Sequence, residues 1–220
     1  VFQCVTTFAD VRASAITIGP KGNLYTVDRS SLIHKVDRTG QVSIFAGTTT
    51  RGYRDGAISS ALFDKIEGIT ADGSGNIYVT DQHRVRKIDV NGMVSTLAGT
   101  GVKGFKDGVG NQAQFNYPRR LVADNQGNVY VADNYRIRKI DKVGNVTTVA
   151  GSGTRGNQDG LALQAQFSNP RAIVRDSKGN LYIVDKEMAS DIRKLDTQGK
   201  VTTLSISLAA NRYIGQPAFD

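Results

Sequence analysis

The chain has 220 residues, and 28 Lys and Arg against 20 Asp and Glu give it a formal net charge of +8. Its single cysteine, Cys4, excludes an internal disulfide, and no apolar run is long enough to cross a membrane as a helix. The excess positive charge suits anionic partners such as RNA, acidic glycans or membrane phosphate, and it suits a role in solubility alone equally well.

The acidic residues are nearly all aspartates, because only Glu67 and Glu187 are glutamates, and the chain has 24 glycines. Asp forms turns by hydrogen-bonding nearby backbone groups, whereas Glu is mainly a helix former. This composition predicts many turns, few helices and an all-β fold.

The first residues, Val1 to Cys4, lack an initiator Met and the basic start of a secretion signal. We expect a mature or trimmed product from which any such signal is already gone. Residues 4–9 match the segment that later ends each repeat, which predicts a fourth strand without its three predecessors. Cys4 is therefore expected to be buried rather than nucleophilic.

A seven-residue pattern, Gly-Asn-x-Tyr-x-x-Asp, occurs four times. Its copies begin at Gly22, Gly75, Gly127 and Gly179, which lie 53, 52 and 52 residues apart. A period of this length marks a supersecondary unit that buries its apolar side against its neighbours. The sequence therefore predicts one continuous array over residues 1–220, with no linker between domains.

Each repeat carries four segments rich in β-branched and aromatic residues, joined in part by Asp-x-x-Gly turns. In the third repeat the predicted strands are residues 120–123, 128–132, 136–140 and 146–150. Four antiparallel strands per repeat predict a β-propeller. The full blades are expected near residues 13–47, 66–99, 118–151 and 170–206.

Long connections follow three of the blades, at residues 46–63, 98–115 and 150–167. Loops of this length are usually functional or packed as compact surface loops. Because the chain reverses at each strand, the Asp-x-x-Gly turns share one face. The long connections, together with the loops from second to third strands, are expected on the opposite face.

The ends of the chain depart from the repeat. Residues 201–205 close the fourth blade, and residues 211–220 are compatible with the start of another. Propellers remove exposed sheet edges by closing a ring, yet the middle strands of a shared closing blade are missing here. Three explanations stay open: a portion of a longer propeller of five or six blades, an irregular closing blade, and closure by another subunit.

At these aligned residues the sequence resembles the NHL repeat family. The resemblance rests on three segments: residues 169–185 (NPRAIVRDSKGNLYIVD), residues 136–141 (RIRKID) and residues 146–151 (VTTVAG). It extends over nearly all of the chain and implies a β-propeller, most often of six blades. The Gly-rich segments between blades are similar to those of secreted or surface NHL proteins of bacteria, which implies binding more than catalysis and an extracellular, cell-surface or periplasmic location.

An acidic residue ends each second strand and a basic residue recurs in the third strands. These residues are Asp28, Asp81, Asp133 and Asp185, and Arg86, Arg138 and Arg193. A catalytic residue is needed once, whereas a structural residue is needed in every blade. We therefore interpret them as structural ion pairs or turn caps.

The sequence predicts no catalytic residue, no metal site and no cofactor. The turn at Asp72 lacks the alternating acidic ligands of a calcium loop, and His34 and His83 are assigned to different blade positions, which disfavours a shared histidine site. No Ser-His-Asp spacing is present. A metal-dependent lyase or hydrolase is kept as the third alternative.

The face with the long loops is the predicted binding surface. Basic residues interleaved with aromatic ones can stack on and neutralise an anionic chain, and the equally weighted alternative is that the aromatics are tucked under their own loops. Phe63, Phe115 and Phe167 are interpreted as core anchors. The candidate binding residues are Arg29, Arg51, Tyr53, Arg54, His83, Arg84, Lys103, Phe105, Lys106, Asn134, Tyr135, Arg136 and Arg155.

The leading hypothesis is a non-enzymatic binding module that presents this face to a glycan or protein partner without inserting into a membrane. An RNA-binding propeller that uses the basic face is the second hypothesis. Self-association is expected if one chain does not close the ring. Function should lie where the copies differ, at Gln82-His83, Asn134-Tyr135 and the insertion at residues 186–191.

Overall fold

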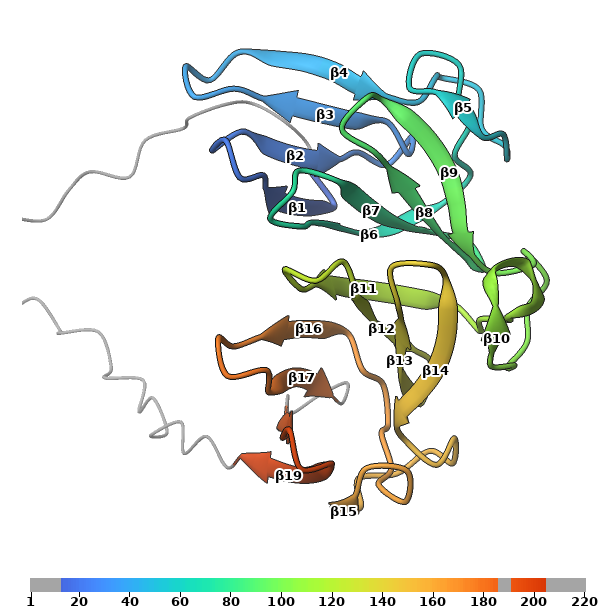
Figure 1. The fold of residues 1–220 in the computed structure, drawn as a ribbon, viewed down its shortest axis with the longest axis vertical. Helices are drawn as coiled ribbons and strands as arrows, with labels where there is room; N and C mark the ends of the chain where they lie inside the picture. Colours follow the sequence, from blue (N-terminus) through green and yellow to red (C-terminus); the bar gives the residue numbers. More distant parts are fainter. Residues whose placement is uncertain (1–12, 186–190, 205–220) are drawn as a thin grey trace, which may run out of the picture.

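The computed structural model describes residues 13–185 and 191–204, and within them every regular element but one is a β-strand. The exception is a 3-10 turn, η1 (Gly110–Gln112). The strands form four antiparallel sheets that follow one another along the longest axis of the molecule (Figure 1). No helix in these residues is long and apolar enough to span a membrane.

The four sheets are the blades of a propeller, and the predicted all-β fold with four-stranded blades is confirmed. Blade 1 contains β1 (Ala15–Ile18), β2 (Leu24–Val27), β3 (Ile33–Val36) and β4 (Val42–Ala46). Blade 2 contains β6 (Ile66–Ala71), β7 (Ile77–Asp81), β8 (Arg84–Ile88) and β9 (Met93–Ala98). Blade 3 contains β11 (Pro118–Ala123), β12 (Val129–Asp133), β13 (Arg136–Ile140) and β14 (Asn145–Ala150). Blade 4 contains β16 (Ala172–Arg175), β17 (Leu181–Asp185), β18 (Asp191–Leu195) and β19 (Lys200–Leu204).

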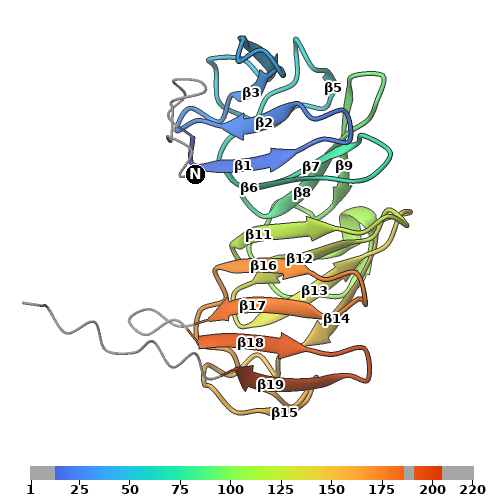
Figure 2. The same cartoon turned by 90° about the vertical axis from the view of Figure 1, so that its left-hand side faces the viewer.

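The first strands of the blades lie at the centre of the array. Strand β6 packs beside both β1 and β11, and β11 packs beside β16, as Figure 2 shows. Within each blade the strands then run outward in sequence order. The segments predicted to begin and end the array, residues 4–9 and 211–220, lie outside the described residues.

Blades 2, 3 and 4 each gain a fifth, outermost strand from the long connection that precedes them. These strands are β5 (Gly56–Ala57), β10 (Gly108–Val109) and β15 (Gly160–Leu161), paired with β9, β14 and β19. The connections therefore descend along the outer edge of the next blade as far as its tight turn, where the Gly110 N–H donates to the Gly144 carbonyl at 2.9 Å.

The placement of the long connections corrects the expectation that they lie wholly on the face opposite the tight turns. The parts around β5, β10 and β15 leave that face, whereas Arg51 and Lys103 remain on it beside Arg29 and Tyr117. The physical reason is that the fourth strand of each of these blades has N–H and C=O groups at its outer edge that need partners. The connection supplies these partners by pairing with that strand.

The tight turns between first and second strands are fixed by Asp side chains, as the Asp-x-x-Gly pattern predicts. One oxygen of Asp72 accepts the backbone N–H groups of Ser74 and Asn76, each at 2.9 Å. Its other oxygen accepts the side-chain amide of Asn76 at 2.7 Å and the hydroxyl of Tyr78 at 3.0 Å. Gly75 follows with φ of 93°, a conformation that glycine adopts without strain.

Replacing Asp72 with Ala is expected to lower the free energy of unfolding by about 1–2 kcal/mol, because Tyr78 and Asn76 lose a buried acceptor. Urea denaturation would measure the loss. The matched control is Asp89→Ala in the second tight turn of blade 2, since Asp89 accepts only two exposed backbone N–H groups. Equal losses in the two variants would contradict the assigned role of Asp72.

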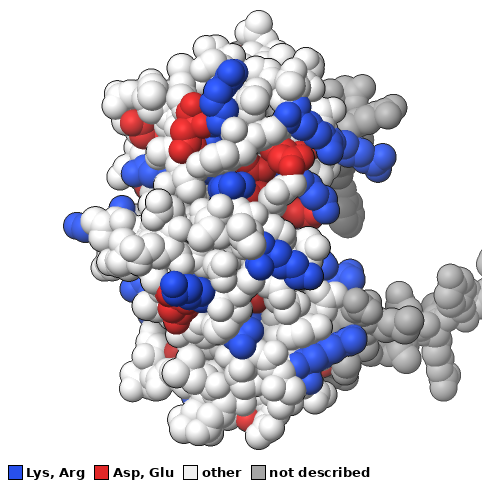
Figure 3. Space-filling model, turned by 90° about the vertical axis from the view of Figure 1, so that its right-hand side faces the viewer, with Lys and Arg blue, Asp and Glu red and all other residues white. Residues whose placement is uncertain are grey.

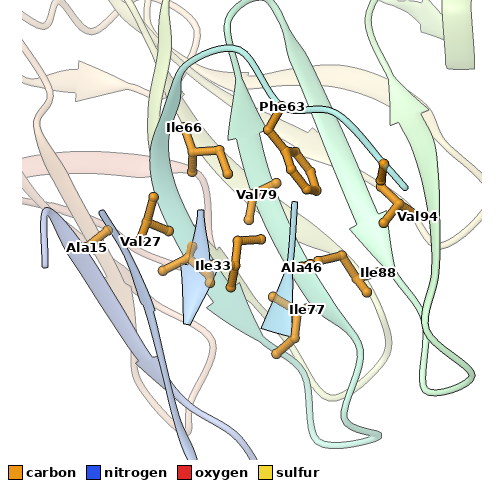
Figure 4. Close-up of a cluster of buried hydrophobic side chains, with 12 residues drawn as sticks. Ala15, Val27, Ile33, Ala46, Phe63, Ile66, Ile77, Val79, Ile88 and Val94 are labelled. Atoms are coloured by element: carbon orange, nitrogen blue, oxygen red, sulfur yellow. The ribbon is translucent and has the colours of Figure 1, made fainter. Parts of the chain in front are cut away.

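The hydrophobic core consists of three clusters, one between each pair of neighbouring blades. Figure 4 shows the first cluster, in which Val27 and Ile33 of blade 1 lie against Val79 and Ile77 of blade 2. Phe63, Phe115 and Phe167 are buried where the long connections return, as predicted. Blades 2 and 3 therefore each use one sheet face against the preceding blade and the other face against the following blade.

Candidate ligand-binding site

A fully buried arginine holds the outer part of blade 2 together. Arg86 donates to Asp81 at 2.9 Å and to Asp55 of the preceding connection at 2.6 Å. It also donates to the carbonyl oxygens of Leu62 and Arg54. The guanidinium thus ties the β7–β8 hairpin to the connection whose strand β5 covers the outer edge of the blade at β9.

The same network is repeated in the next two blades. Arg138 pairs with Asp133 at 2.8 Å and Asp107 at 2.7 Å. Arg193 pairs with Asp185 at 3.4 Å and Asp159 at 2.8 Å. Burial raises the pKa of Asp133 to about 6, although Arg138 and a backbone N–H act against it. The predicted structural ion pairs are confirmed in blades 2, 3 and 4.

Blade 1 replaces this network with a smaller one. In the sheet of blade 1, His34 lies opposite Thr26 of β2 and Ile44 of β4. In blade 2, Arg86 lies opposite Val79 of β7 and Thr96 of β9, which are the equivalent positions. His34 therefore occupies the arginine position, and its Nε2 lies 3.0 Å from Asp28.

The pKa of Asp28 reflects this smaller network. Burial alone would raise it, but hydrogen bonds from His34 and from the backbone N–H groups of Leu32 and Ser30 outweigh burial and lower it. His34 is thus a structural substitute for arginine, and it stands apart from His83 as the sequence predicts.

Two aromatic residues of the predicted binding surface are covered by arginines of the same surface. The guanidinium of Arg84 lies 3.8 Å from the ring centre of Tyr53, and that of Arg136 lies 3.5 Å from the ring centre of Phe105. Tyr53 also contacts the hydroxyl of Thr96 at 2.9 Å. Each ring therefore stacks with the arginine that begins a third strand, and Tyr53 and Phe105 stay 48% and 44% exposed, so neither ring is tucked under its own loop.

Other candidate residues are dispersed over the molecule. Arg54 donates to the Ser60 carbonyl within its own connection. Lys106 and Arg155 are exposed on the connections of different blades, while Asn134 and Tyr135 are half-buried in the hairpin loop of blade 3. Basic and acidic side chains lie next to one another on the face shown in Figure 3, so the molecule has no uniformly basic surface there.

A pocket of about 430 Å³ opens between blades 2 and 3 on the side of the β7–β8 loop. We call it the Tyr117 pocket. It combines cationic, anionic, amide and aromatic groups, and of the predicted residues it contains His83. Its lining residues are Lys65, Glu67, Gln82, His83, Tyr117, Pro118 and Arg119.

Tyr117 is held in an unusual conformation at the edge of this pocket. Its φ is 58°, in the left-handed region that a bulky residue rarely enters, and its side chain is largely exposed. His83 packs edge-on against the Tyr117 ring with centroids 4.8 Å apart, and the Lys103 amine lies 4.7 Å from the ring centre. Backbone strain of this kind concentrates at ligand clamps and active sites.

Burial, and then the charges of Lys103 and Arg84, lower the pKa of His83 and favour its neutral form. Its Nδ1 accepts the Tyr117 N–H at 3.4 Å. The proton of the neutral ring is therefore on Nε2, which is available as a donor.

A second pocket of about 220 Å³ adjoins the first and shares Lys65 and Glu67 with it. We call it the Arg29 pocket. Arg29, Arg51 and Arg120 add three cations, and Arg51 donates to the Arg29 carbonyl at 2.5 Å. Lys65 and Glu67 form an ion pair of 2.7 Å at the boundary between the two pockets. The structure thus brings together Arg29, Arg51, His83 and Lys103 from the predicted set.

Sequence reasoning missed most of the residues that complete these pockets: Tyr117, Lys65, Glu67, Arg119 and Arg120. One difference between the repeats could have indicated them. Just before or at the start of the first strand, the equivalent positions hold Lys65, Tyr117 and Asn169, three unlike residues in an otherwise regular repeat. The predicted difference at Gln82-His83 does lie in the pocket. Residues 186–190 of the predicted insertion lie outside the described residues.

In the part of the chain that the structure describes, no three His, Cys, Asp or Glu side chains converge in a way that could hold a metal ion. The arrangement offers hydrogen-bond donors, cations and one aromatic ring edge around two connected cavities. Such a set of groups can orient and neutralise a small anionic ligand.

Comparison with known proteins agrees with the fold. A model of the NHL repeat matches residues 115–138. The chain is 37% identical over 152 residues to the protein SUPPRESSOR OF QUENCHING 1, chloroplastic, of Arabidopsis thaliana, a match that covers 62% of this chain and 14% of that protein.

Two solved structures from Bacteroides thetaiotaomicron are similar. One is a protein of unknown function, with a TM-score of 0.68 and 26% identity over 82% of this chain and 46% of that one. The other is described as an auxiliary nutrient binding protein, with a TM-score of 0.63 and 24% identity over 86% of this chain and 47% of that one. The chain spans less than half the length of each of these three relatives.

Proposed function

Because this chain carries NHL repeats folded into β-propeller blades, we propose that it is a binding module whose Tyr117 and Arg29 pockets take a small glycan bearing carboxylate groups. The observation that carries this proposal is Tyr117 itself. It combines an exposed ring, a strained backbone and two side-chain partners at the edge of a pocket that a sugar residue fits.

The charges around the pockets support an acidic ligand. Arg119 is exposed beside the Tyr117 pocket, and Arg29 and Arg51 line the neighbouring one. A carboxylate accepts two parallel N–H bonds from a guanidinium, and an aromatic ring packs against the C–H face of a sugar. Of the two acids that line the pockets, Glu67 pairs with Lys65 at 2.7 Å, and Asp28 lies 3.0 Å from His34.

Two solved structures with a similar fold support a binding function in general. The structural relative named as a nutrient binding protein has a similar fold, and another structural relative is the extracellular domain of a one-component system. A location outside the cytoplasm, at a bacterial surface or in the periplasm, is part of the proposal. A protein partner of the same surface, RNA and a propeller-type lyase or hydrolase are the alternatives that the experiment below separates.

RNA is less well supported than an acidic glycan. Bases need free ring faces for stacking, and Arg84 and Arg136 occupy one face of the Tyr53 and Phe105 rings, which are 48% and 44% exposed. The two pockets are partly open, and their linings include the acids Glu67 and Asp28, so they do not form a uniformly basic groove.

Isothermal titration calorimetry with digalacturonic acid tests the proposal, with neutral galactobiose as the matched ligand. We expect binding of the acidic disaccharide only. Arg119→Ala should weaken it at least about tenfold, because a charge-assisted hydrogen bond contributes roughly 1.5–3 kcal/mol. Lys106→Ala, which removes an exposed charge outside both pockets, should leave affinity unchanged.

Tyr117→Gly separates binding from stability. Glycine relieves the strain at φ 58° while it removes the ring, so thermal stability should be retained while affinity falls. Binding of digalacturonic acid that is equal in wild type, Arg119→Ala and Tyr117→Gly would show that these pockets are not the site. Retention of RNA in place of the disaccharide, or turnover of the sugar, would favour the alternatives.

A further inference from the structure

Another pocket, of about 340 Å³, lies between blades 1 and 2 on the face of the tight turns. We call it the Tyr25 pocket. Its walls are the β1–β2 turn, the two tight turns of blade 2, and Ile58 of the connection that precedes blade 2. The Tyr117 and Arg29 pockets open at the opposite ends of the strands, and neither shares a lining residue with the Tyr25 pocket.

The β1–β2 turn lacks the aspartate that begins the first tight turn of blades 2, 3 and 4. Gly19 stands at the position of Asp72, Asp124 and Asp176. The turn still closes through its backbone, because the Gly22 N–H donates to the Gly19 carbonyl at 2.9 Å. Blade 1 therefore keeps the turn but has no carboxylate in it.

The missing carboxylate leaves two side chains of blade 1 without a hydrogen-bond partner. In blade 4, one oxygen of Asp176 accepts the amide of Asn180 at 2.8 Å and the hydroxyl of Tyr182 at 3.2 Å. The equivalent residues of blade 1 are Asn23 and Tyr25, and within the described residues neither side chain makes a hydrogen bond. Both are half-buried and line the pocket, which therefore holds two donors that need an acceptor.

Two aromatic rings form the apolar part of the pocket. Tyr25 packs edge-on against Phe45, with ring centres 4.8 Å apart and planes at 68°. In blades 2 and 3 the position of Phe45 holds the aliphatic residues Leu97 and Val149, so these two blades lack such a pair. From blade 2 the lining includes Val90, which is 66% exposed. An apolar ligand group in the pocket would remove these surfaces from water.

The pocket also contains one cation and one anion, on different blades. Lys21 of blade 1 is exposed, and no salt bridge within the described residues joins it to Asp89 of blade 2. One oxygen of Asp89 accepts two backbone N–H groups. In blade 3 the other oxygen of the equivalent Asp141 accepts the amide of Asn145 at 2.7 Å, but Met93 takes the Asn145 position in blade 2. The second oxygen of Asp89 is therefore an acceptor without a donor among the described residues.

We propose that the Tyr25 pocket binds a free α-amino acid with a large apolar side chain. The ligand carboxylate accepts from Asn23 and Tyr25, as the turn aspartate does in other blades, and Lys21 adds its positive charge. The ligand ammonium group donates to the second oxygen of Asp89, and the apolar side chain packs against Phe45. A volume of about 340 Å³ lies within the roughly 300–1,000 Å³ of small-molecule sites.

The two charges of the pocket select a zwitterion. A ligand with a carboxylate alone would place that charge near Asp89, and a ligand with an amine alone would place its charge near Lys21. An amino acid carries both groups on one carbon atom and meets each with the opposite charge. This site is separate from the glycan pockets, and the proposal does not rest on them.

Isothermal titration calorimetry of the 220-residue chain with L-phenylalanine tests this proposal. The matched ligands are phenylacetate, which lacks the ammonium group, and 2-phenylethylamine, which lacks the carboxylate. We expect each to bind at least about tenfold more weakly than L-phenylalanine, because each loses charge-assisted hydrogen bonds. L-Alanine, which lacks the ring, should also bind at least about tenfold more weakly.

Gly19→Asp supplies the missing carboxylate from the chain itself. The φ of Gly19 is not positive, so the backbone accepts Asp there. A Cβ atom would lie 2.9 Å from Cε2 of Tyr25, so the ring must shift, toward the arrangement in which Tyr78 donates to Asp72. The affinity for L-phenylalanine should fall at least about tenfold, because the new carboxylate takes up the donors of Asn23 and Tyr25. The melting temperature should be retained or raised, since the turn gains its cap.

Ser177→Asp is the matched control, because it adds the same charge to the exposed first turn of blade 4, away from the pocket, and should leave affinity unchanged. Asp89→Asn keeps an acceptor for the two backbone N–H groups and should weaken L-phenylalanine at least about tenfold. Failure of L-phenylalanine to bind the wild type, or equal affinity in wild type, Gly19→Asp and Asp89→Asn, overturns the proposal. Titration of Gly19→Asp with digalacturonic acid should match wild type, so the two sites are tested separately.

Discussion

Replacing Arg138 with Ala is expected to lower the free energy of unfolding by about 3–5 kcal/mol, because it leaves a buried carboxylate without its partner. Asp133 is almost completely buried 2.8 Å from the Arg138 guanidinium. The variant also removes the donor to the carbonyl oxygens of Gln114 and Lys106 and leaves Asp107 of the preceding connection with Thr148 as its partner. Chemical denaturation followed by circular dichroism measures the loss.

The free energy lost when Arg138 is removed differs from the net stability that the intact Arg138–Asp133 pair contributes, and the pKa of Asp133 shows the difference. Burial raises that pKa to about 6, so between pH 4 and 6 the folded chain binds more protons than the unfolded chain. The stability contributed by this carboxyl is therefore fully present below about pH 4 and is lost as the pH rises through 6. The ion pair at neutral pH is thus costly to break without being a large source of stability.

Two control variants test the explanation. Arg136→Ala removes a partly exposed guanidinium two residues away and should cost much less. His34→Ala removes the substitute in blade 1, whose side chain is 18% exposed and faces one carboxylate, and it should also cost less. A combined Arg138→Met, Asp133→Asn variant that is as unstable as Arg138→Ala would contradict the role assigned to the uncompensated charge.

The repeat explains how much of the fold could be predicted. Gly75 and Asp72 specify a turn through local backbone geometry, and alternation of apolar residues specifies the strands, so both are local properties of the sequence. The pairing of Asp133 with Arg138 could be predicted because it recurs in step. The placement of β5, β10 and β15 could not, since a two-residue strand has too little periodicity to be recognised.

The site was predicted less well for a different reason. For Tyr53 and Phe105 the sequence left two interpretations equally open, a free stacking ring and a ring tucked under its own loop. Each ring instead stacks on an arginine that begins a third strand, Arg84 or Arg136. Tyr117 was missed because its importance comes from a φ of 58° and from His83, 34 positions earlier in the chain. Neither the conformation nor the contact leaves a local sequence pattern.

Gly68→Ala is expected to destabilise the fold at or above the upper end of the about 1–3 kcal/mol that overpacking costs. Gly68 lies where β6 has a register irregularity and β11 approaches it. A Cβ atom at Gly68 would lie 2.4 Å from the Arg119 carbonyl oxygen and 3.1 Å from the Arg120 Cα. Backbone atoms cannot move aside as a flexible side chain can, so the two blades must separate.

The separation should also affect the Tyr117 pocket, because the same strands carry its lining residues Glu67 and Arg119. The Gly68 N–H donates to the Thr80 hydroxyl at 2.9 Å, and that hydroxyl donates to the Arg119 carbonyl at 2.8 Å. Pushing Arg119 away breaks this chain of hydrogen bonds. In the Gly68→Ala variant we therefore expect both faster hydrogen exchange of the backbone amide at position 68 and a lower denaturation midpoint.

Gly73→Ala is the matched control, since a Cβ there meets only the side chain of Asn125, at 3.1 Å. That side chain can rotate, so the control should change stability little. If Gly68→Ala and Gly73→Ala were equally stable, close approach of the backbones of β6 and β11 would not be what holds blades 2 and 3 together. The apolar cluster around Val85 and Leu121 would then be sufficient to fix their spacing, and the pocket between the blades would owe its shape to side-chain packing alone.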